Sequence, residues 1–251
     1  MTYLAKLGEL TLKGSNIQEF ENLLKHNTAK CLEGTGSKIT LRAGRLYIDC
    51  EEQAAGKVEF MLKHLIGITG WAKCSIAEKN IESIKKVSFD LAKLMAQKGC
   101  KTFKIDSRRA DKSFPLNSYE INCEAAGDIE TLMKVDVHKP DCVIYIEVRE
   151  KVYVYTDSET GPRGLPVGCS GKGLLLLSGG LDSPVAGYRM LRRGMKIECC
   201  DFHSYPYTSE EAKQKVVTLG QKLAYYGIQT YLNIIPFTEV QMRIKEKVMR
   251  K

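Results

Sequence analysis

The sequence predicts a chain of mixed α/β and α+β class, in which two α+β modules precede a doubly wound parallel sheet. The first 75 residues follow the strand and helix order β-α-β-β-α-β, which is typical of a ferredoxin-like fold. From residue 172 onward strands and helices alternate. Glycine and proline clusters at residues 161–162 and 164–168 mark a linker before that point. We therefore expect domains at residues 1–75, 76–165 and 172–251.

The first module opens with a strand over residues 2–7. Ser15 then begins a helix, because Gln18 three residues later completes a capping box. Two strands follow, over residues 38–41 and 45–49. A second helix covers residues 54–65, and a strand covers residues 67–75.

The second module starts with an amphipathic helix that Asn80 caps. A strand over residues 102–107 and a helix over residues 118–132 follow. Residues 141–156 alternate as expected for a hairpin whose turn lies at Glu150 and Lys151.

The third module alternates strand and helix, over residues 174–177, 184–193, 196–202, 209–226, 229–235 and 236–251. The four leucines of its first strand indicate a buried parallel strand. Three strands make a thin sheet for a nucleotide-binding fold, so we expect this domain to be incomplete.

The segment LLLLSGGLDSP over residues 174–184 carries the clearest chemistry. Glycines between a strand and a helix let backbone N–H groups approach phosphate oxygens, and serine hydroxyls add donors. There is no lysine of the kinase-type loop, and Asp182 instead suggests a magnesium ion bridging to pyrophosphate. The alternative is an ordinary glycine turn with a solvated aspartate.

Composition narrows the class of protein. Hydrophobic residues make up 43% of the 251 residues, and no apolar run approaches the ~18 residues of a membrane span. With no signal sequence at the N-terminus, we expect a cytoplasmic protein without membrane contact. The nine cysteines include no CxxC pair, and we interpret the adjacent Cys199 and Cys200 as packing residues rather than reactive thiols.

Basic residues are concentrated between residues 98 and 113, although the net charge of the whole chain is only +8. That local density can neutralise several backbone phosphates. We predict that the contacts to nucleic acid are made by Lys104, Arg108, Arg109 and Lys112. The alternative is a solvated charged face.

Six ordered segments resemble one family. They are KLGELTLKG (6–14), TFKIDSRRADKSFP (102–115), VDVHKPD (135–141), GPRGLPVGCSGKG (161–173), SGGLDS (178–183) and FHSYPYTS (202–209). The loop alone resembles the pyrophosphate loop of ATP pyrophosphatases. Together the segments are similar to the tRNA uracil 4-sulfurtransferase family, which is also linked to thiamine biosynthesis.

The resemblance implies a ferredoxin-like domain, a THUMP RNA-binding domain and an ATP-pyrophosphatase (adenine nucleotide alpha hydrolase-like) domain. It implies that ATP and Mg²⁺ adenylate the uridine at position eight of tRNA, and that sulfur then displaces AMP to give 4-thiouridine. The sulfur arrives as a persulfide from a cysteine desulfurase, and it also feeds thiamine thiazole synthesis. In the family the sulfur-carrying cysteine lies downstream of residue 251.

The resemblance also assigns residues. Ser178 and Asp182 are the catalytic candidates, with Asp182 as the metal ligand. The loop residues Ser178, Gly179, Gly180, Asp182 and Ser183 hold the phosphates, and the adenosine contacts fall on Leu176, Leu177, Asp201 and Phe202. Family members often carry histidine at the position of Asp201, so a main-chain contact is the expectation there. Phe202 as core packing and His203 as a structural or a catalytic histidine stay open.

Two rival interpretations remain. One is a non-catalytic tRNA-binding protein, and the other is a different pyrophosphatase-domain enzyme, such as a thiolase or lysidine-type ligase acting elsewhere on tRNA. For residues 1–251 alone we expect tRNA binding, weak adenine nucleotide binding and no complete thiolation. The oligomeric state is open, with a homodimer as one alternative.

Overall fold

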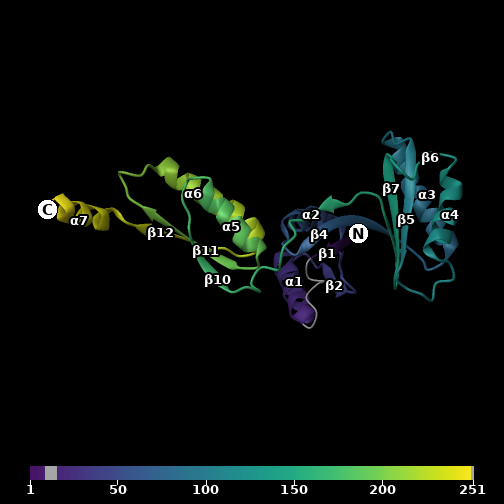
Figure 1. Cartoon of the computed structure of the whole chain (residues 1–251), viewed down its shortest axis with the longest axis horizontal. Helices are drawn as coiled ribbons and strands as arrows, with labels where there is room; N and C mark the ends of the chain where they lie inside the picture. Colours follow the sequence, from purple (N-terminus) through teal and green to yellow (C-terminus); the bar gives the residue numbers. More distant parts are fainter. Residues whose placement is uncertain (9–15, 250–251) are drawn as a thin grey trace.

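The computed structural model describes residues 1–8 and 16–249 and arranges them as three units in a row (Figure 1). Two of the units share one continuous sheet, and the third has a separate sheet. The predicted mixed class, with a ferredoxin-like unit first and a parallel α/β unit last, is confirmed. No helix within the described ranges has both the length and the apolar character that crossing a bilayer requires.

The first unit has the predicted ferredoxin-like order. Its elements are β1 (Thr2–Leu7), α1 (Ile17–Cys31), β2 (Lys38–Arg42), β3 (Arg45–Asp49), the 3-10 turn η3 (Glu52–Ala54), α2 (Ala55–His64) and β4 (Ile68–Ala77). The strands lie in the order β2-β3-β1-β4 and neighbours are antiparallel. The predicted helix start at Ser15 lies outside the described residues.

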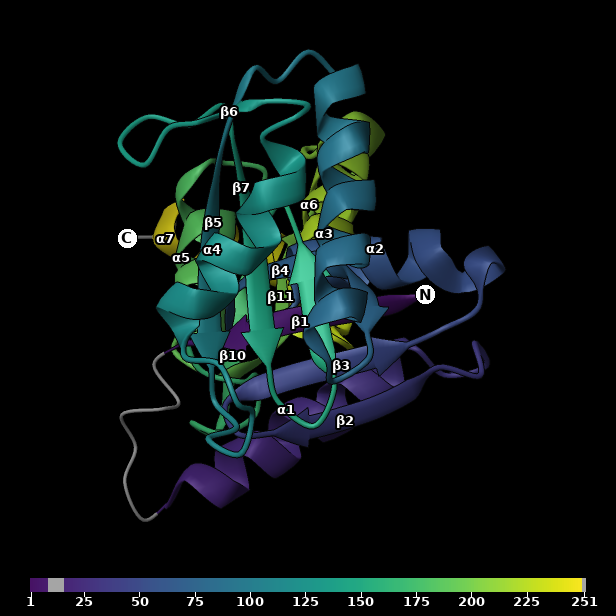
Figure 2. The same ribbon diagram turned by 90° about the vertical axis from the view of Figure 1, so that its right-hand side faces the viewer.

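The second unit continues the same sheet. It contains α3 (Ile81–Gln97), β5 (Thr102–Arg109), α4 (Ser118–Ile129), β6 (Lys134–Val135), β7 (Cys142–Val148), β8 (Val152–Tyr155) and β9 (Glu159–Thr160). Asn80 caps α3 by accepting a hydrogen bond from the Ser83 N–H at 2.7 Å. Figure 2 shows α3 and α4 side by side over the strands of this unit. The hairpin β7–β8 is confirmed.

Strand β4 joins the two units and is longer than the sequence predicts. Its first part pairs with β1, and residues Ser75–Ala77 pair with β8. The predicted end at residue 75 is therefore two residues early, because tertiary pairing with β8 extends the strand beyond its local signal. β9 then pairs with Gly70 and Trp71 of β4. After the second unit, the chain therefore runs back beside the first unit before it reaches the third.

The third unit is a parallel sheet of order β10-β11-β12. Its elements are β10 (Lys172–Leu176), α5 (Asp182–Arg192), β11 (Lys196–His203), α6 (Glu210–Gly227), β12 (Leu232–Pro236) and α7 (Thr238–Met249). The expectation of a strand buried on both faces is wrong for β10. Leu174 and Leu176 are 65% and 60% exposed, because the described helices α5 and α6 cover only the opposite face, to which Leu175 points.

Aromatic side chains connect the first and third units. The Phe60 ring lies 5.2 Å from the Tyr225 ring, and the His64 ring lies 4.9 Å from the Tyr226 ring. Asn27 of α1 also donates a buried hydrogen bond of 2.9 Å to the carbonyl of Val167 in the linker. The linker is thus packed against the ferredoxin-like unit.

Candidate functional site

The loop after β10 is held in shape by its two serines. The Ser178 N–H donates to Ser183 Oγ at 3.0 Å, and the two hydroxyl oxygens lie 3.1 Å apart. The Gly180 N–H makes a longer contact of 3.4 Å to Ser178 Oγ. These bonds tie the end of the strand to the first turn of α5. The loop is therefore already folded around the N-terminus of the helix, where backbone N–H groups attract anions.

Asp182 is the first residue of α5, which begins two residues earlier than the sequence predicts. Its side chain is exposed, and no cation of the described residues forms an ion pair with it. Within those residues, no group of three metal-binding side chains comes together. A hard carboxylate oxygen beside exposed backbone N–H groups suits a magnesium ion that takes most of its ligands from water and phosphate.

The neighbouring strand brings the other predicted nucleotide contacts to the same edge. Leu176 is in register with Cys200, and the Leu177 N–H donates to the Cys200 carbonyl at 2.8 Å. Asp201 and Phe202 therefore follow directly beside the loop, at the carboxyl edge of the sheet where such folds bind ligands. Phe202 is 47% exposed, with its ring 5.1 Å from Phe237, so it is not a core residue.

Lys215 is a candidate that sequence reasoning misses. It is exposed on α6, and its Cδ lies 3.5 Å from the position that a Cβ on Gly179 would occupy. The side chain of a lysine distant in sequence thus lies over the loop, which itself has none. Spacing along α6 gives no signal for this, because the contact depends on how α6 packs beside the loop.

His203 ends β11 and is only 9% exposed. Neither ring nitrogen has a hydrogen-bond partner among the described residues, although Glu210 Oε1 lies 3.7 Å from Nε2. Cys199 and Cys200, by contrast, are both buried, and burial raises the pKa of the Cys199 thiol. These features agree with packing residues rather than reactive thiols.

The predicted RNA-binding residues do not share one surface. Lys104 and Arg108 alternate with the core residues Phe103 and Ile105 of β5, so they lie on the face opposite α3 and α4. Arg109 points to the other face, where its Nη1 donates to the Phe114 carbonyl at 3.1 Å. That guanidinium holds the loop before α4.

Two further basic residues, Lys6 and Lys112, lie near β5. Lys112 is exposed in the turn after the strand. Lys6 of β1, which the charge pattern does not reveal, lies 5.1 Å from the ring centres of both Tyr145 and Tyr155. Burial, together with the nearby charges of Arg45 and Arg108, lowers the pKa of Lys6. Lys6 therefore belongs to the same face as Lys104 and Arg108.

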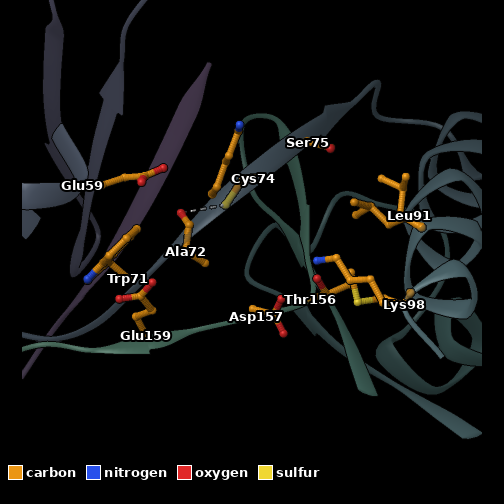
Figure 3. A pocket seen from close by; sticks show the side chains of 13 residues that line it. Glu59, Trp71, Ala72, Cys74, Ser75, Leu91, Lys98, Thr156, Asp157 and Glu159 are labelled. Carbon is orange, nitrogen blue, oxygen red and sulfur yellow. Dashed lines mark hydrogen bonds between the residues drawn. The ribbon is translucent and has the colours of Figure 1, made fainter. Parts of the chain in front are cut away.

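A hollow of about 450 Å³ lies between the first two units (Figure 3). Its lining mixes carboxylates of Glu59, Asp157 and Glu159 with the amines of Lys73 and Lys98. It contains none of the predicted site residues, and its balanced charges favour no single class of ligand. The loop after β10 therefore remains the candidate site.

Models of known protein families match the three units of the fold separately. A thiamine biosynthesis protein (ThiI) family model matches residues 168–251, and a ThiI ferredoxin-like domain model matches residues 2–72. A THUMP domain model matches residues 78–157 between them. The chain belongs to the ThiI family. The resemblance that the sequence motifs indicate is thereby confirmed.

Two relatives of this ThiI family chain are named as probable tRNA sulfurtransferases. A probable tRNA sulfurtransferase of Treponema pallidum (strain Nichols) is 47% identical over 248 residues, which are 97% of this chain and 62% of the relative. One from Caldanaerobacter subterraneus is 42% identical, over 97% of this chain and 64% of the relative. The chain thus spans somewhat more than three fifths of the curated relatives it matches.

Two solved structures are similar along nearly the whole chain. The crystal structure of a 4-thiouridine synthetase–RNA complex with bound ATP has a TM-score of 0.86 and 36% identity, covering 98% of this chain and 64% of that chain. The structure of PH1313 from Pyrococcus horikoshii has a TM-score of 0.82 and 25% identity, covering 98% and 82%. The ThiI fold assignment therefore extends over all three units.

Proposed function

We propose that the chain acts in an ATP-dependent tRNA sulfurtransferase, which adenylates uridine at position eight of tRNA and replaces its O4 with sulfur. The observation that carries the proposal is the folded SGGLDS loop at the N-terminus of α5, in a chain that also has a THUMP unit. The 36% identity to a 4-thiouridine synthetase solved with RNA and ATP supports the same reaction. The same sulfur transfer would feed thiamine thiazole synthesis.

In this proposal the loop positions the polyphosphate of ATP. Backbone N–H groups of Gly179 and Gly180 and the hydroxyls of Ser178 and Ser183 donate to phosphate oxygens. Leu176, Leu177, Asp201 and Phe202 contact the adenosine at the neighbouring strand ends. Asp182 would hold a magnesium ion, which when bound offsets negative charge on the phosphates.

Uracil O4 attacks the α-phosphorus, the bond from the α-phosphorus to the bridging oxygen breaks, and pyrophosphate leaves. The resulting adenylate makes O4 a good leaving group, because it departs as AMP. The terminal sulfur of a persulfide, which a cysteine desulfurase supplies, then attacks C4 and AMP leaves. A second thiol cleaves the S–S bond, so that the sulfur stays on C4 and the two thiols end as a disulfide. We further propose domains at residues 1–75, 76–165 and 172–251, a cytoplasmic location, and tRNA as the partner, with a homodimer left to direct measurement.

The test is a thiolation assay on a protein with the length of the curated relatives. Protein, tRNA, ATP, magnesium and a persulfide donor are incubated, and the near-ultraviolet absorbance of 4-thiouridine is followed. We expect ATP-dependent product at position eight. ATP consumption with a non-absorbing tRNA product would favour a different pyrophosphatase-domain enzyme, and tRNA binding without ATP consumption would favour a non-catalytic protein. The same assay on residues 1–251 decides whether these residues suffice.

Replacing both Lys104 and Arg108 with alanine is expected to weaken tRNA binding for all tRNA sequences. Each lost phosphate contact makes the dependence of log Kd on log salt shallower by about 0.7 to 0.9. Filter binding between low and moderate salt measures this slope. The matched control replaces Lys86 and Lys93, which are exposed on α3 over the opposite face. Equal loss in both double variants would mean that net charge, not this face, is responsible.

Lys215→Met should weaken ATP binding about ten-fold while leaving tRNA affinity unchanged. The substitution keeps the aliphatic stem over Gly179 but removes a charge near the phosphates, and one charge-assisted hydrogen bond is worth about 1.5 kcal/mol or more. Isothermal titration calorimetry with ATP measures the effect. Lys222→Met, on the same helix, is the control. Unaltered ATP affinity in the Lys215 variant would remove this lysine from the site.

A further inference from the structure

Three arginines form a basic triad at the C-terminal end of α5. Arg192 and Arg193 follow Arg189 by three and four residues, a spacing that places each of them beside Arg189 on the helix surface. With Gly164 of the linker they line a hollow of about 480 Å³. None of the three forms an ion pair with a carboxylate in the described part of the chain. The hollow therefore concentrates positive charge without an internal counterion.

Arg192 is held in place by contacts other than an ion pair. Its guanidinium carbon lies 5.9 Å from the centre of the Tyr188 ring. Its Nε is buried, and that atom has no hydrogen-bond partner among the residues the structure describes. Keeping an unmatched charge partly out of water costs free energy, which a bound anion would recover. Arg192 is thus preorganised for an anionic ligand.

The triad is also not needed to cap its own helix. The Leu165 N–H donates to the Arg192 carbonyl at 3.0 Å, and Ser170 Oγ donates to the Arg193 carbonyl at 2.7 Å. Arginines in a last helical turn often bind these carbonyls themselves. Here the linker occupies them, so the guanidinium groups remain free for an external acceptor.

Gly164 fixes the linker against the helix. Its φ is +84°, and an added Cβ would lie 2.3 Å from the Arg192 carbonyl oxygen. A side chain at this position would therefore push the linker away and open the hollow. The close approach makes the hollow a built feature of the junction rather than a chance gap between side chains.

Helix α5 connects the triad to the nucleotide loop. The loop precedes Asp182 at one end, the triad lies at the other, and eleven helical residues span about 16 Å. In Figure 1 this helix lies in the part of the third unit that is nearest the ferredoxin-like unit. A chain of phosphates bound at the triad can therefore reach the loop within a few nucleotides.

We propose that Arg189, Arg192 and Arg193 bind backbone phosphates of the tRNA close to the nucleotide that reacts at the loop. Guanidinium groups pair with phosphate oxygens in a bidentate manner, which fits repeated phosphates better than a single small anion. This inference rests on the tRNA part of the proposed function. It adds a contact surface on the nucleotide-binding unit to the surface on the THUMP unit.

The test is the affinity of the 251-residue chain for fluorescently labelled tRNA as a function of salt. The variant R189Q/R193Q removes the two exposed arginines and leaves Arg192 on its ring. We expect tRNA binding about 10- to 50-fold weaker at 0.1 M salt, and a slope of log Kd against log salt shallower by about 1.4 to 1.8. R189K/R193K should restore most of the slope. The affinity for ATP should not change.

The matched control is R243Q/K247Q, which removes two exposed basic residues of α7 in the same unit. Equal loss in this control would overturn the proposal, as would an unchanged slope in R189Q/R193Q or a loss of ATP affinity in place of tRNA affinity. Thermal melting of each variant shows whether the variant is folded. If the unaltered chain fails to bind tRNA, the proposed function fails as well, whereas an unchanged double variant overturns only the triad.

Discussion

Asp182→Ala is expected to abolish magnesium-dependent ATP turnover in a protein with the length of the curated relatives, while tRNA binding stays nearly unchanged. The carboxylate is exposed at the first position of α5, beside the folded loop. Charge stabilisation by a bridging metal is worth several kcal/mol, and each 1.36 kcal/mol changes a rate about ten-fold. The rate of pyrophosphate release should therefore fall by orders of magnitude, which a coupled pyrophosphate assay measures.

The control for this variant is Asp90→Ala, which removes an exposed aspartate from α3, far along the chain from the loop. It should retain full turnover. Asp182→Asn keeps the size of the side chain and should be nearly as impaired as the alanine variant, because the amide lacks the charge. Near-normal turnover in either Asp182 variant would take the loop carboxylate out of the mechanism.

Local signals predict the parts of the fold that depend on neighbouring residues. The hairpin turn at Glu150 and Lys151, the cap at Asn80 and the loop after β10 follow from patterns within a few residues. What the sequence cannot give is which face of a strand another element covers. Leu174 and Leu176 therefore look buried in the sequence and are exposed in the fold.

The same limit applies to the candidate sites. The loop residues are contiguous, so the sequence identifies them, whereas Lys215 reaches the loop from a different helix. In the basic segment, adjacent residues of a strand point to opposite faces. Arg108 and Arg109 are consequently separated, and the Arg109 guanidinium donates to the carbonyl of Phe114. Charge density in a sequence thus predicts a region and not a surface.

A buried ion cluster between the first two units could not be predicted either. Glu147 of β7 is 2% exposed and accepts hydrogen bonds from Arg149 Nε at 2.9 Å, Arg45 Nε at 3.2 Å and the Tyr155 hydroxyl at 3.1 Å. Arg45 comes from β3 of the ferredoxin-like unit, 102 residues away in sequence. The cluster therefore ties the two halves of the continuous sheet together.

Glu147→Gln is expected to destabilise the protein by about 3 to 5 kcal/mol, because it leaves two largely buried guanidinium groups without a counterion. Burial raises the pKa of Glu147, but the charges and hydrogen bonds of Arg45 and Arg149 outweigh it, and the folded-state pKa is below its ordinary value. A lowered pKa contributes stability that is present above the unfolded pKa of about 4.3 and is lost as pH falls through the folded pKa. The unaltered chain should therefore lose this contribution as the pH falls below about 4.3, and the variant should lack it at every pH.

Urea unfolding followed by circular dichroism at several pH values measures both effects. The matched control is Glu150→Gln, which breaks the 2.8 Å ion pair of Glu150 with Arg42 between the same two units. Both partners of that pair are solvent-exposed, so water screens their charges and the expected loss is below about 1 kcal/mol. A Glu147→Gln variant as stable as Glu150→Gln, with the same pH dependence as the unaltered chain, would show that the buried cluster does not hold the two units together.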